Sequence, residues 1–208
     1  MIRLNELPQT YLVTPEPLPD QPLADFIAHL ERALEAGVRL VQLRAKTLTA
    51  PQYARLAEQA LACCRHHDAR LLLNAPARVA LAMQADGVHL TSTRLMACEA
   101  RPLPAELLVS VACHDARQVL QANRIGADLM TISPVLPTAT HTTAVPLGWP
   151  RFSELAASTT IPVYALGGMT AETLAQAHKA GAYGIAAIRS LWDGATAVPS
   201  AGVGSEPG

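Results

Sequence analysis

The chain has 208 residues, of which 50% are hydrophobic and 16% are charged, and its formal net charge is -1. This composition suits one globular domain with a sizeable core. The balance of 16 basic and 17 acidic residues, without a basic run, argues against nucleic acid as a partner. The sequence has neither a signal-peptide pattern nor a run of apolar residues that could cross a bilayer, so we expect a cytoplasmic protein that binds no membrane. The four cysteines are expected to be reduced thiols.

Short apolar segments alternate with helical patterns along the whole chain. In chain order the predicted strands are 10–13, a segment within 35–44, 70–73, a segment within 84–91, 107–111, a segment within 124–133, 162–166 and a segment within 179–189. The predicted helices are 22–36, 50–67, 76–83, 115–124, 149–157 and 170–180, with shorter ones after the fourth and eighth strands. In the four joints where a strand follows a helix at once, a glycine ends the helical pattern, and Gly37, Gly126 and Gly181 suit the left-handed position that closes a helix.

Strict alternation of strand and helix favours a parallel sheet. Eight strands with intervening helices predict a single α/β domain, a (β/α)8 TIM barrel over residues 1–192. A doubly wound open sheet is the structural alternative, and the lack of a GxGxxG motif after the first strand weakens it. The tail 193–208 is rich in small residues, proline and glycine, and we expect it to be disordered.

The active site of such a barrel lies at the carboxyl ends of the strands. At the end of the second strand, the alternate residues Gln42, Arg44 and Lys46 fall on one side of the chain. Arg44 and Lys46 offer a planar donor group and a mobile ammonium, which suit a phosphate or pyrophosphate. An ion pair between these residues and a neighbouring strand end is the open alternative.

Histidine and asparagine residues end three further strands. Asn74 ends the third strand, His89 the fourth and His114 the fifth. A capping pattern, Asp115 with Gln118, follows His114 at once and predicts a helix start there. His114 could therefore lie at the barrel mouth and transfer a proton, or it could merely cap that helix or bond a backbone group.

A pair of glycines and a short polar segment indicate a phosphate site. Gly167 and Gly168 follow the seventh strand, and Arg189 and Ser190 follow the eighth. In many barrels the backbone amides of the loops after these two strands face a phosphate group. We therefore expect these four residues to bind an anion.

Five motifs resemble one family in order and spacing, and they are QLRAK (42–46), ADGVHL (85–90), SPVLPTAT (133–140), IPVYALGGMT (161–170) and GAYGIAAI (181–188). The chain is similar to the thiamin phosphate synthase and TenI superfamily. The resemblance implies a small thiazole or pyrimidine phosphate as the ligand. It also implies that the loop after the sixth strand contributes to its binding through Thr138, Thr140 and His141, the last standing where the family has a lysine.

The synthases of this family use magnesium held by two aspartates, and this chain has Ala75 and Arg94 at those places. A methyl group and a cation cannot hold magnesium. The resemblance therefore implies a TenI-like thiazole tautomerase without metal or other cofactor, in which His114 is the acid and base. A thiamin phosphate synthase that uses magnesium is one alternative, and a non-catalytic module that binds a thiamin-related phosphate is another.

A further resemblance concerns the partners of the chain. The segment RLNELPQTYLVTP near the start and GIAAIRSLW near residue 190 are similar to the barrel that is fused to Nudix hydrolases in some bacteria. This resemblance implies a Nudix hydrolase as a candidate partner, and a second copy of the chain is a separate candidate. The sequence leaves this choice open.

Overall fold

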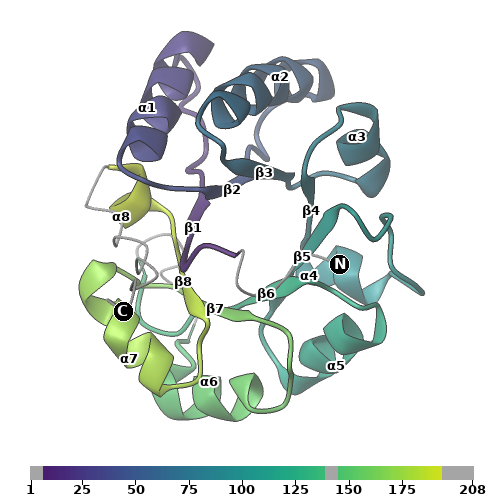
Figure 1. Cartoon of the computed structure of the whole chain (residues 1–208), viewed down its shortest axis with the longest axis vertical. Coiled ribbons are helices and arrows are strands. Elements are labelled where there is room, and N and C mark those ends of the chain that lie inside the picture. The colour runs from purple at the N-terminus through teal and green to yellow at the C-terminus, as the bar shows by residue number, and fades with distance from the viewer. Residues whose placement is uncertain (1–6, 139–144, 194–208) are drawn as a thin grey trace, which may run out of the picture.

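The protein is a closed barrel of eight parallel strands, seen along its axis in Figure 1. The computed structural model describes residues 7–138 and 145–193. Each strand pairs with the next in the chain, and the first and last close the ring. The strands are β1 Thr10–Val13, β2 Leu40–Leu43, β3 Arg70–Leu73, β4 Gly87–Leu90, β5 Leu108–Cys113, β6 Leu129–Ile132, β7 Val163–Leu166 and β8 Gly184–Ala187. The predicted (β/α)8 barrel is thus confirmed, and the open sheet is wrong.

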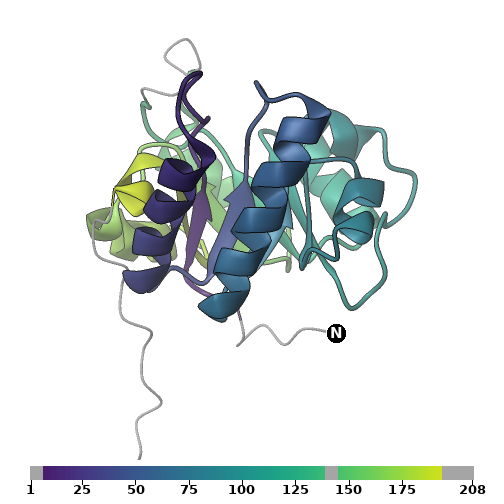
Figure 2. The same ribbon diagram turned by 90° about the horizontal axis from the view of Figure 1, so that it is seen from above.

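Helices surround the barrel, and Figure 2 shows α1 and α2 side by side on its outside. They are α1 Leu23–Glu35, α2 Ala50–His66, α3 Ala77–Ala82, α4 Ser92–Met96, α5 Ala116–Arg124, α6 Gly148–Ala156, α7 Leu174–Lys179 after a 3-10 turn Ala171–Thr173, and α8 Arg189–Trp192. All the helices predicted from periodicity are present within a residue or two, except that the 3-10 turn begins the seventh. Prediction and structure therefore agree on which elements exist, while the fifth strand extends two residues further than predicted, to Cys113.

Glycines close the helices at three of the four predicted joints. Gly37, Gly126 and Gly181 have φ angles of 99°, 65° and 92°, in the left-handed region that disfavours a side chain. The joint before β4 is different, because Gln84 takes the left-handed conformation with φ 53°. There Gly87 lies in the strand, where a Cβ atom would come within 2.1 Å of the Leu108 carbonyl oxygen. At this joint the prediction that a glycine ends the helix was thus wrong, because Gln84 ends it and Gly87 belongs to the strand.

Two apolar clusters make up the core. The larger one lies between the strands and the helices, as expected for strand residues that face outward in a barrel. The smaller one fills the inside of the barrel with Leu7, which precedes β1, and with the strand residues Tyr11, Leu40, Leu72, Leu108, Leu129, Tyr164 and Ala186. Tyr164 also donates a hydrogen bond of 2.6 Å to the carbonyl oxygen of Pro8. The interior below the strand carboxyl ends is therefore packed.

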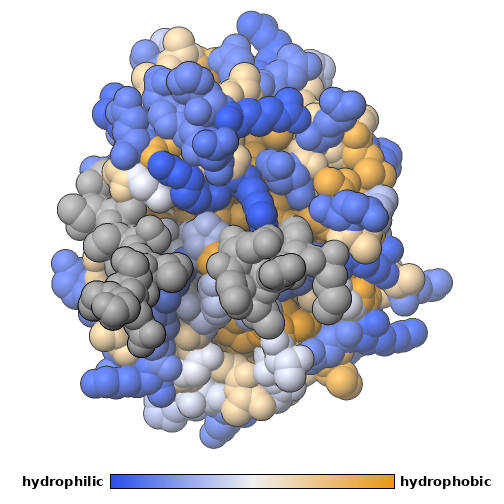
Figure 3. Space-filling model, in the orientation of Figure 1, coloured by the Kyte–Doolittle hydropathy of each residue, from blue (hydrophilic) through white to orange (hydrophobic). Residues whose placement is uncertain are grey.

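The outer surface is mostly hydrophilic on the face shown in Figure 3, where apolar residues form small separate areas. Within residues 7–138 and 145–193, no helix has the length and apolar character needed to span a membrane. Cys63, Cys64, Cys98 and Cys113 are free thiols, as predicted. Of the predicted tail 193–208, only Asp193 lies in the described ranges. The disorder of the tail therefore stays a prediction.

Candidate active site

A cavity of about 710 Å³ opens at the carboxyl ends of the strands. Its walls include most of the predicted site residues: Gln42, Arg44, Lys46, Asn74, His89, His114, Thr138 and Gly167. The alternation in β2 does bring Gln42, Arg44 and Lys46 to one side, because all three line this cavity. Thr140 and His141 lie outside the described residues. The cavity thus gathers side chains from strands that are far apart in the sequence.

Arg44 forms the ion pair that was the open alternative for it. Its Nη1 lies 2.6 Å from Oε2 of Glu16, a residue in the loop after β1, and both side chains are largely buried. The other oxygen of Glu16 accepts a hydrogen bond of 2.8 Å from the backbone of Thr47. Glu16 therefore fixes both the guanidinium and the loop after β2. Lys46 is exposed at the cavity wall.

The places of the two family aspartates hold no metal ligand. Ala75 is buried and has no oxygen in its side chain. Arg94 extends from α4 and donates a hydrogen bond of 3.1 Å from Nη1 to Oδ1 of Asn74. In residues 7–138 and 145–193, no three His, Cys, Asp or Glu side chains cluster in a way that could hold a metal ion. The donor set here does not fit magnesium, because a guanidinium repels a cation and an alanine supplies no ligand.

His89 lies on the inner side of β4 and is buried. Its Nδ1 lies 2.9 Å from the hydroxyl oxygen of Ser110, the residue opposite it on β5. Burial, with the nearby charges of Arg94 and Lys46, lowers the pKa of His89 to about 3. The imidazole is therefore neutral near pH 7, and a role as a charged phosphate ligand does not suit it.

His114 follows β5 and is exposed to the cavity. Its Nδ1 lies 2.8 Å from the carbonyl oxygen of Ser133 at the end of β6. A carbonyl oxygen can only accept, so Nδ1 carries the proton, and Nε2 of the neutral ring is then a proton acceptor. The backbone N–H of His114 also donates to Oε1 of Gln118 at 2.7 Å. His114 thus bonds a backbone carbonyl through Nδ1, and its Nε2 is still available as a base.

The predicted cap after His114 is only partly as expected. The Asp115 side chain accepts a hydrogen bond of 2.8 Å from the backbone of Gln118, as in a capping box. The Gln118 side chain, however, bonds the backbone of His114 rather than that of Asp115. This shift connects the start of α5 to the histidine and holds the strand end in place.

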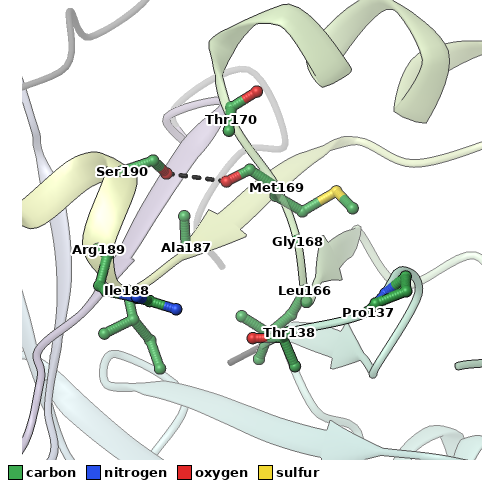
Figure 4. Close-up of a pocket in the computed structure, with 11 residues that line it drawn as sticks. Pro137, Thr138, Leu166, Gly168, Met169, Thr170, Ala187, Ile188, Arg189 and Ser190 are labelled. Carbon is green, nitrogen blue, oxygen red and sulfur yellow. Dashed lines mark hydrogen bonds between the residues drawn. The ribbon is translucent and has the colours of Figure 1, made fainter. Parts of the chain in front are cut away.

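A second recess of about 240 Å³ lies beside the main cavity, between the loop after β7 and the start of α8 (Figure 4). Gly167, Gly168, Arg189, Ser190 and Thr138 line it, and Figure 4 shows Thr138 beside Leu166, across from Arg189 and Ser190. The Ser190 hydroxyl donates a hydrogen bond of 2.8 Å to the carbonyl oxygen of Met169. The four residues predicted to bind an anion are therefore brought together.

Both glycines of this recess are required by their surroundings. Gly167 and Gly168 have φ angles of 102° and 71°. A Cβ atom at Gly167 would come within 3.0 Å of Pro134, and one at Gly168 within 2.8 Å of the Leu136 Cβ atom. The loop after β6 thus approaches the backbone after β7 too closely for side chains at these positions.

Four residues of the site were not singled out from the sequence. Glu16 follows the first strand without any motif, and Tyr11, Ser110 and Thr131 are single polar residues within apolar strands. Thr131 lines the cavity, and its hydroxyl is buried with no hydrogen-bond partner in the described residues. The inward side of each strand, which alternation predicts, was the signal available for these last three residues.

The fold and the site together define a (β/α)8 barrel whose strand ends form a polar cavity next to an anion-sized recess. Residues 10–191 match the family model for thiamine monophosphate synthase. The chain belongs to this family, as the motifs predicted.

Relatives and solved structures agree with this membership. The chain is 37% identical over 183 residues to a putative thiamine-phosphate synthase 2 of Aquifex aeolicus, covering 88% of this chain and 97% of that one. It is 38% identical over 169 residues to a putative thiamine-phosphate synthase of Geobacter sulfurreducens, covering 80% and 79%. A thiamine phosphate pyrophosphorylase from Pyrococcus furiosus has the same fold, with a TM-score of 0.73 at 23% identity over 92% and 94% of the two chains. A second copy or a Nudix hydrolase as partner stays a prediction.

Proposed function

We propose that the cavity binds a thiazole carboxylate phosphate. We further propose that His114 moves a proton from one position of the thiazole ring to another. The hydrogen bond from His114 Nδ1 to the Ser133 carbonyl carries this proposal, since it leaves Nε2 as a base in the cavity. The proton that the ring loses at one position returns to it at another. The reaction is an isomerisation that needs no second substrate.

The phosphate of the substrate would be held in the recess beside the cavity. Gly167 and Gly168 leave the backbone open to an anion there, and the Arg189 side chain adds a positive charge (Figure 4). Thr138 contributes a hydroxyl group to the same recess, whereas the Ser190 hydroxyl donates to the Met169 carbonyl oxygen and holds the loop after β7 in place. Such an anchor would keep the ring at a fixed distance from His114.

The metal positions support a reaction without magnesium. Arg94 and Ala75 would not hold the ion that neutralises a departing pyrophosphate. A proton transfer within one ring has no such leaving group. Positive charge at the cavity wall is supplied by Lys46, while Arg44 on the same wall is paired with Glu16.

The synthase reaction is the second candidate. The curated relatives bear the name thiamine-phosphate synthase, and this favours the synthase over the tautomerase. Gln42, Arg44, Lys46 and Asn74 of the synthase motif also line the cavity. This candidate requires that a pyrimidine pyrophosphate react with a thiazole phosphate although Ala75 and Arg94 replace the metal ligands.

The two reactions can be separated with purified protein. Conversion of the thiazole carboxylate phosphate to its aromatic tautomer, followed by absorbance or NMR without magnesium, is the expected result. Formation of thiamin phosphate from the two precursors with magnesium, and no tautomerisation, would establish the second candidate instead. Calorimetric binding of thiazole phosphate with neither reaction would identify a non-catalytic module.

The role of His114 has its own test. His114→Gln removes the base, and we expect the rate of tautomerisation to fall about a hundred-fold or more while binding persists. His66→Gln, at an exposed position at the end of α2, is the matched control. An unchanged rate in His114→Gln would rule out the proposed role.

A further inference from the structure

Six side chains form a continuous series of hydrogen bonds across the barrel. Their order, from the half-buried α4 to the buried β4, is Arg94, Asn74, Gln42, Tyr11, Ser110 and His89. The five donor–acceptor distances are 3.1, 3.0, 3.3, 3.2 and 2.9 Å. We call this series the polar chain. It joins Arg94, which stands where the family has a metal-binding aspartate, to His89 on the inner wall of the cavity.

The residue at one end determines the direction of the whole chain. A guanidinium has donors but no acceptor, so Asn74 must turn its oxygen toward Arg94. Its amide nitrogen then donates to Gln42, whose own nitrogen donates to the Tyr11 hydroxyl oxygen. Each amide thus accepts a hydrogen bond through its oxygen from the preceding residue and donates one through its nitrogen to the next residue. Arg94 thus fixes the orientation of both amides, and the direction of the hydroxyl links follows when every donor hydrogen in the series is used.

The same logic reaches His89 through the last two links. The Tyr11 hydroxyl, having accepted from Gln42, donates to the Ser110 oxygen. The Ser110 hydrogen is then directed to Nδ1 of His89, because a proton on Nδ1 would leave the Ser110 hydrogen without an acceptor in this series; Nδ1 is therefore unprotonated in the arrangement that uses every donor. In the neutral ring the proton is therefore on Nε2. His89 presents an N–H donor, whereas His114 presents an acceptor.

The inner wall of the cavity contains two polar groups without a partner in residues 7–138 and 145–193. No hydrogen bond joins Nε2 of His89 to these residues, and the Thr131 hydroxyl is buried without one. Both residues line the same cavity. A buried polar group without a partner costs stability, so such a group at the wall of a cavity indicates a place for a polar atom of a ligand.

We propose that Arg94 is a positioning residue that fixes the tautomer of His89, and that His89 Nε2–H and the Thr131 hydroxyl together bind a hydrogen-bond acceptor of the substrate. A ring carboxylate or a ring nitrogen has the required chemistry. The second part rests on the proposed function, because that function supplies the heteroaromatic carboxylate. The first part concerns the free protein and stands without it.

Nitrogen NMR of protein labelled in its histidine rings tests the first part, because it distinguishes protonated from unprotonated ring nitrogens. At about pH 7 we expect His89 to be neutral with its proton on Nε2. Detection of the proton on Nδ1 in the free protein would overturn the inference. A mixture of the two tautomers would overturn it as well.

Two variants examine the cause of the tautomer. Arg94→Glu replaces a donor by a group that only accepts, so every link should reverse and the His89 proton should move to Nδ1. Ser110→Ala cuts the last link and should give a mixture of tautomers. Arg124→Glu makes the same charge change at an exposed position on α5 and should leave His89 as in the wild type. A His89 spectrum that is the same in Arg94→Glu and Arg124→Glu would refute the role of Arg94.

Thr131→Val tests the second part of the inference. The unpartnered hydroxyl contributes nothing to the free protein, so the urea midpoint should not fall. Affinity for thiazole carboxylate phosphate, measured by calorimetry, should fall about five-fold, and Thr131→Ser should restore it. Affinity for the thiazole phosphate that lacks the carboxylate should change less. Equal losses for both compounds would refute the acceptor site, and no binding of either by the wild type would instead refute the proposed function.

Discussion

The buried histidine of β4 should make the stability of the barrel depend on pH. The pKa of His89 is lowered from 6.5 to about 3 in the folded protein, chiefly by burial. Between these values the unfolded chain binds a proton that the folded chain does not, so stability falls as the pH drops from about 6.5 toward 3. The full difference corresponds to about 5 kcal/mol, a large share of the stability of an ordinary domain.

Urea unfolding of the wild type and of His89→Asn at several pH values measures this effect. The asparagine oxygen can accept the Ser110 hydrogen bond but does not titrate. Between about pH 6.5 and 4.5 the wild type should lose about 2 to 3 kcal/mol more than the variant, or about 1.4 kcal/mol for each pH unit. His66→Asn, which removes an exposed imidazole, should retain the wild-type slope. Parallel curves for the wild type and His89→Asn would show that His89 accepts a proton in the folded state and would refute the reasoning.

Two further substitutions test the framework of the site by urea unfolding. Gly168→Ala should cost about 1 to 3 kcal/mol, because φ is 71° and the new Cβ atom would lie 2.8 Å from that of Leu136. A stability equal to the wild type would show that the loop after β6 moves freely. Asp128→Ala should cost about 1 to 3 kcal/mol, because Oδ2 accepts bonds of 2.7 Å from both Arg101 and the Val109 backbone. A loss below about 0.5 kcal/mol would mean that water replaces both bonds.

The sequence predicted the strands and helices because each is short and ends at a clear signal. Apolar runs bounded by proline, glycine or polar segments placed β1 and β3 at the observed residues. The end of β5 was missed, since Ala112 and Cys113 continue the strand up to the polar residues that follow. The joint before β4 was misinterpreted because Gly87 is needed for close contact between strands, whereas Gln84 takes the left-handed conformation. The reason for a glycine depends on its neighbours in space.

The candidate site was predicted where a residue follows a strand end and missed where it lies within a strand. His114 and the two glycines of the recess follow strand ends, so the rule for barrels finds them. Ser110 and Thr131 are isolated within apolar strands, and their importance depends on the register between strands. Ser110 lies opposite His89 only because Val88 pairs with Val109. Pairing of this kind is a property of the closed barrel and not of any single segment.

The apolar cluster inside the barrel has a consequence for the order of events at the site. In the described parts of the chain, Leu7, Tyr11 and Tyr164 fill the end below the cavity, so the opening for a ligand lies at the strand carboxyl ends. Two substrates of a condensation would therefore share one opening, so the deeper one would have to bind first, and the joined product and the released pyrophosphate would have to leave through the same opening. An isomerisation sets no such order. Steady-state kinetics that show an obligatory sequence of binding would thus be a signature of the synthase reaction in this barrel.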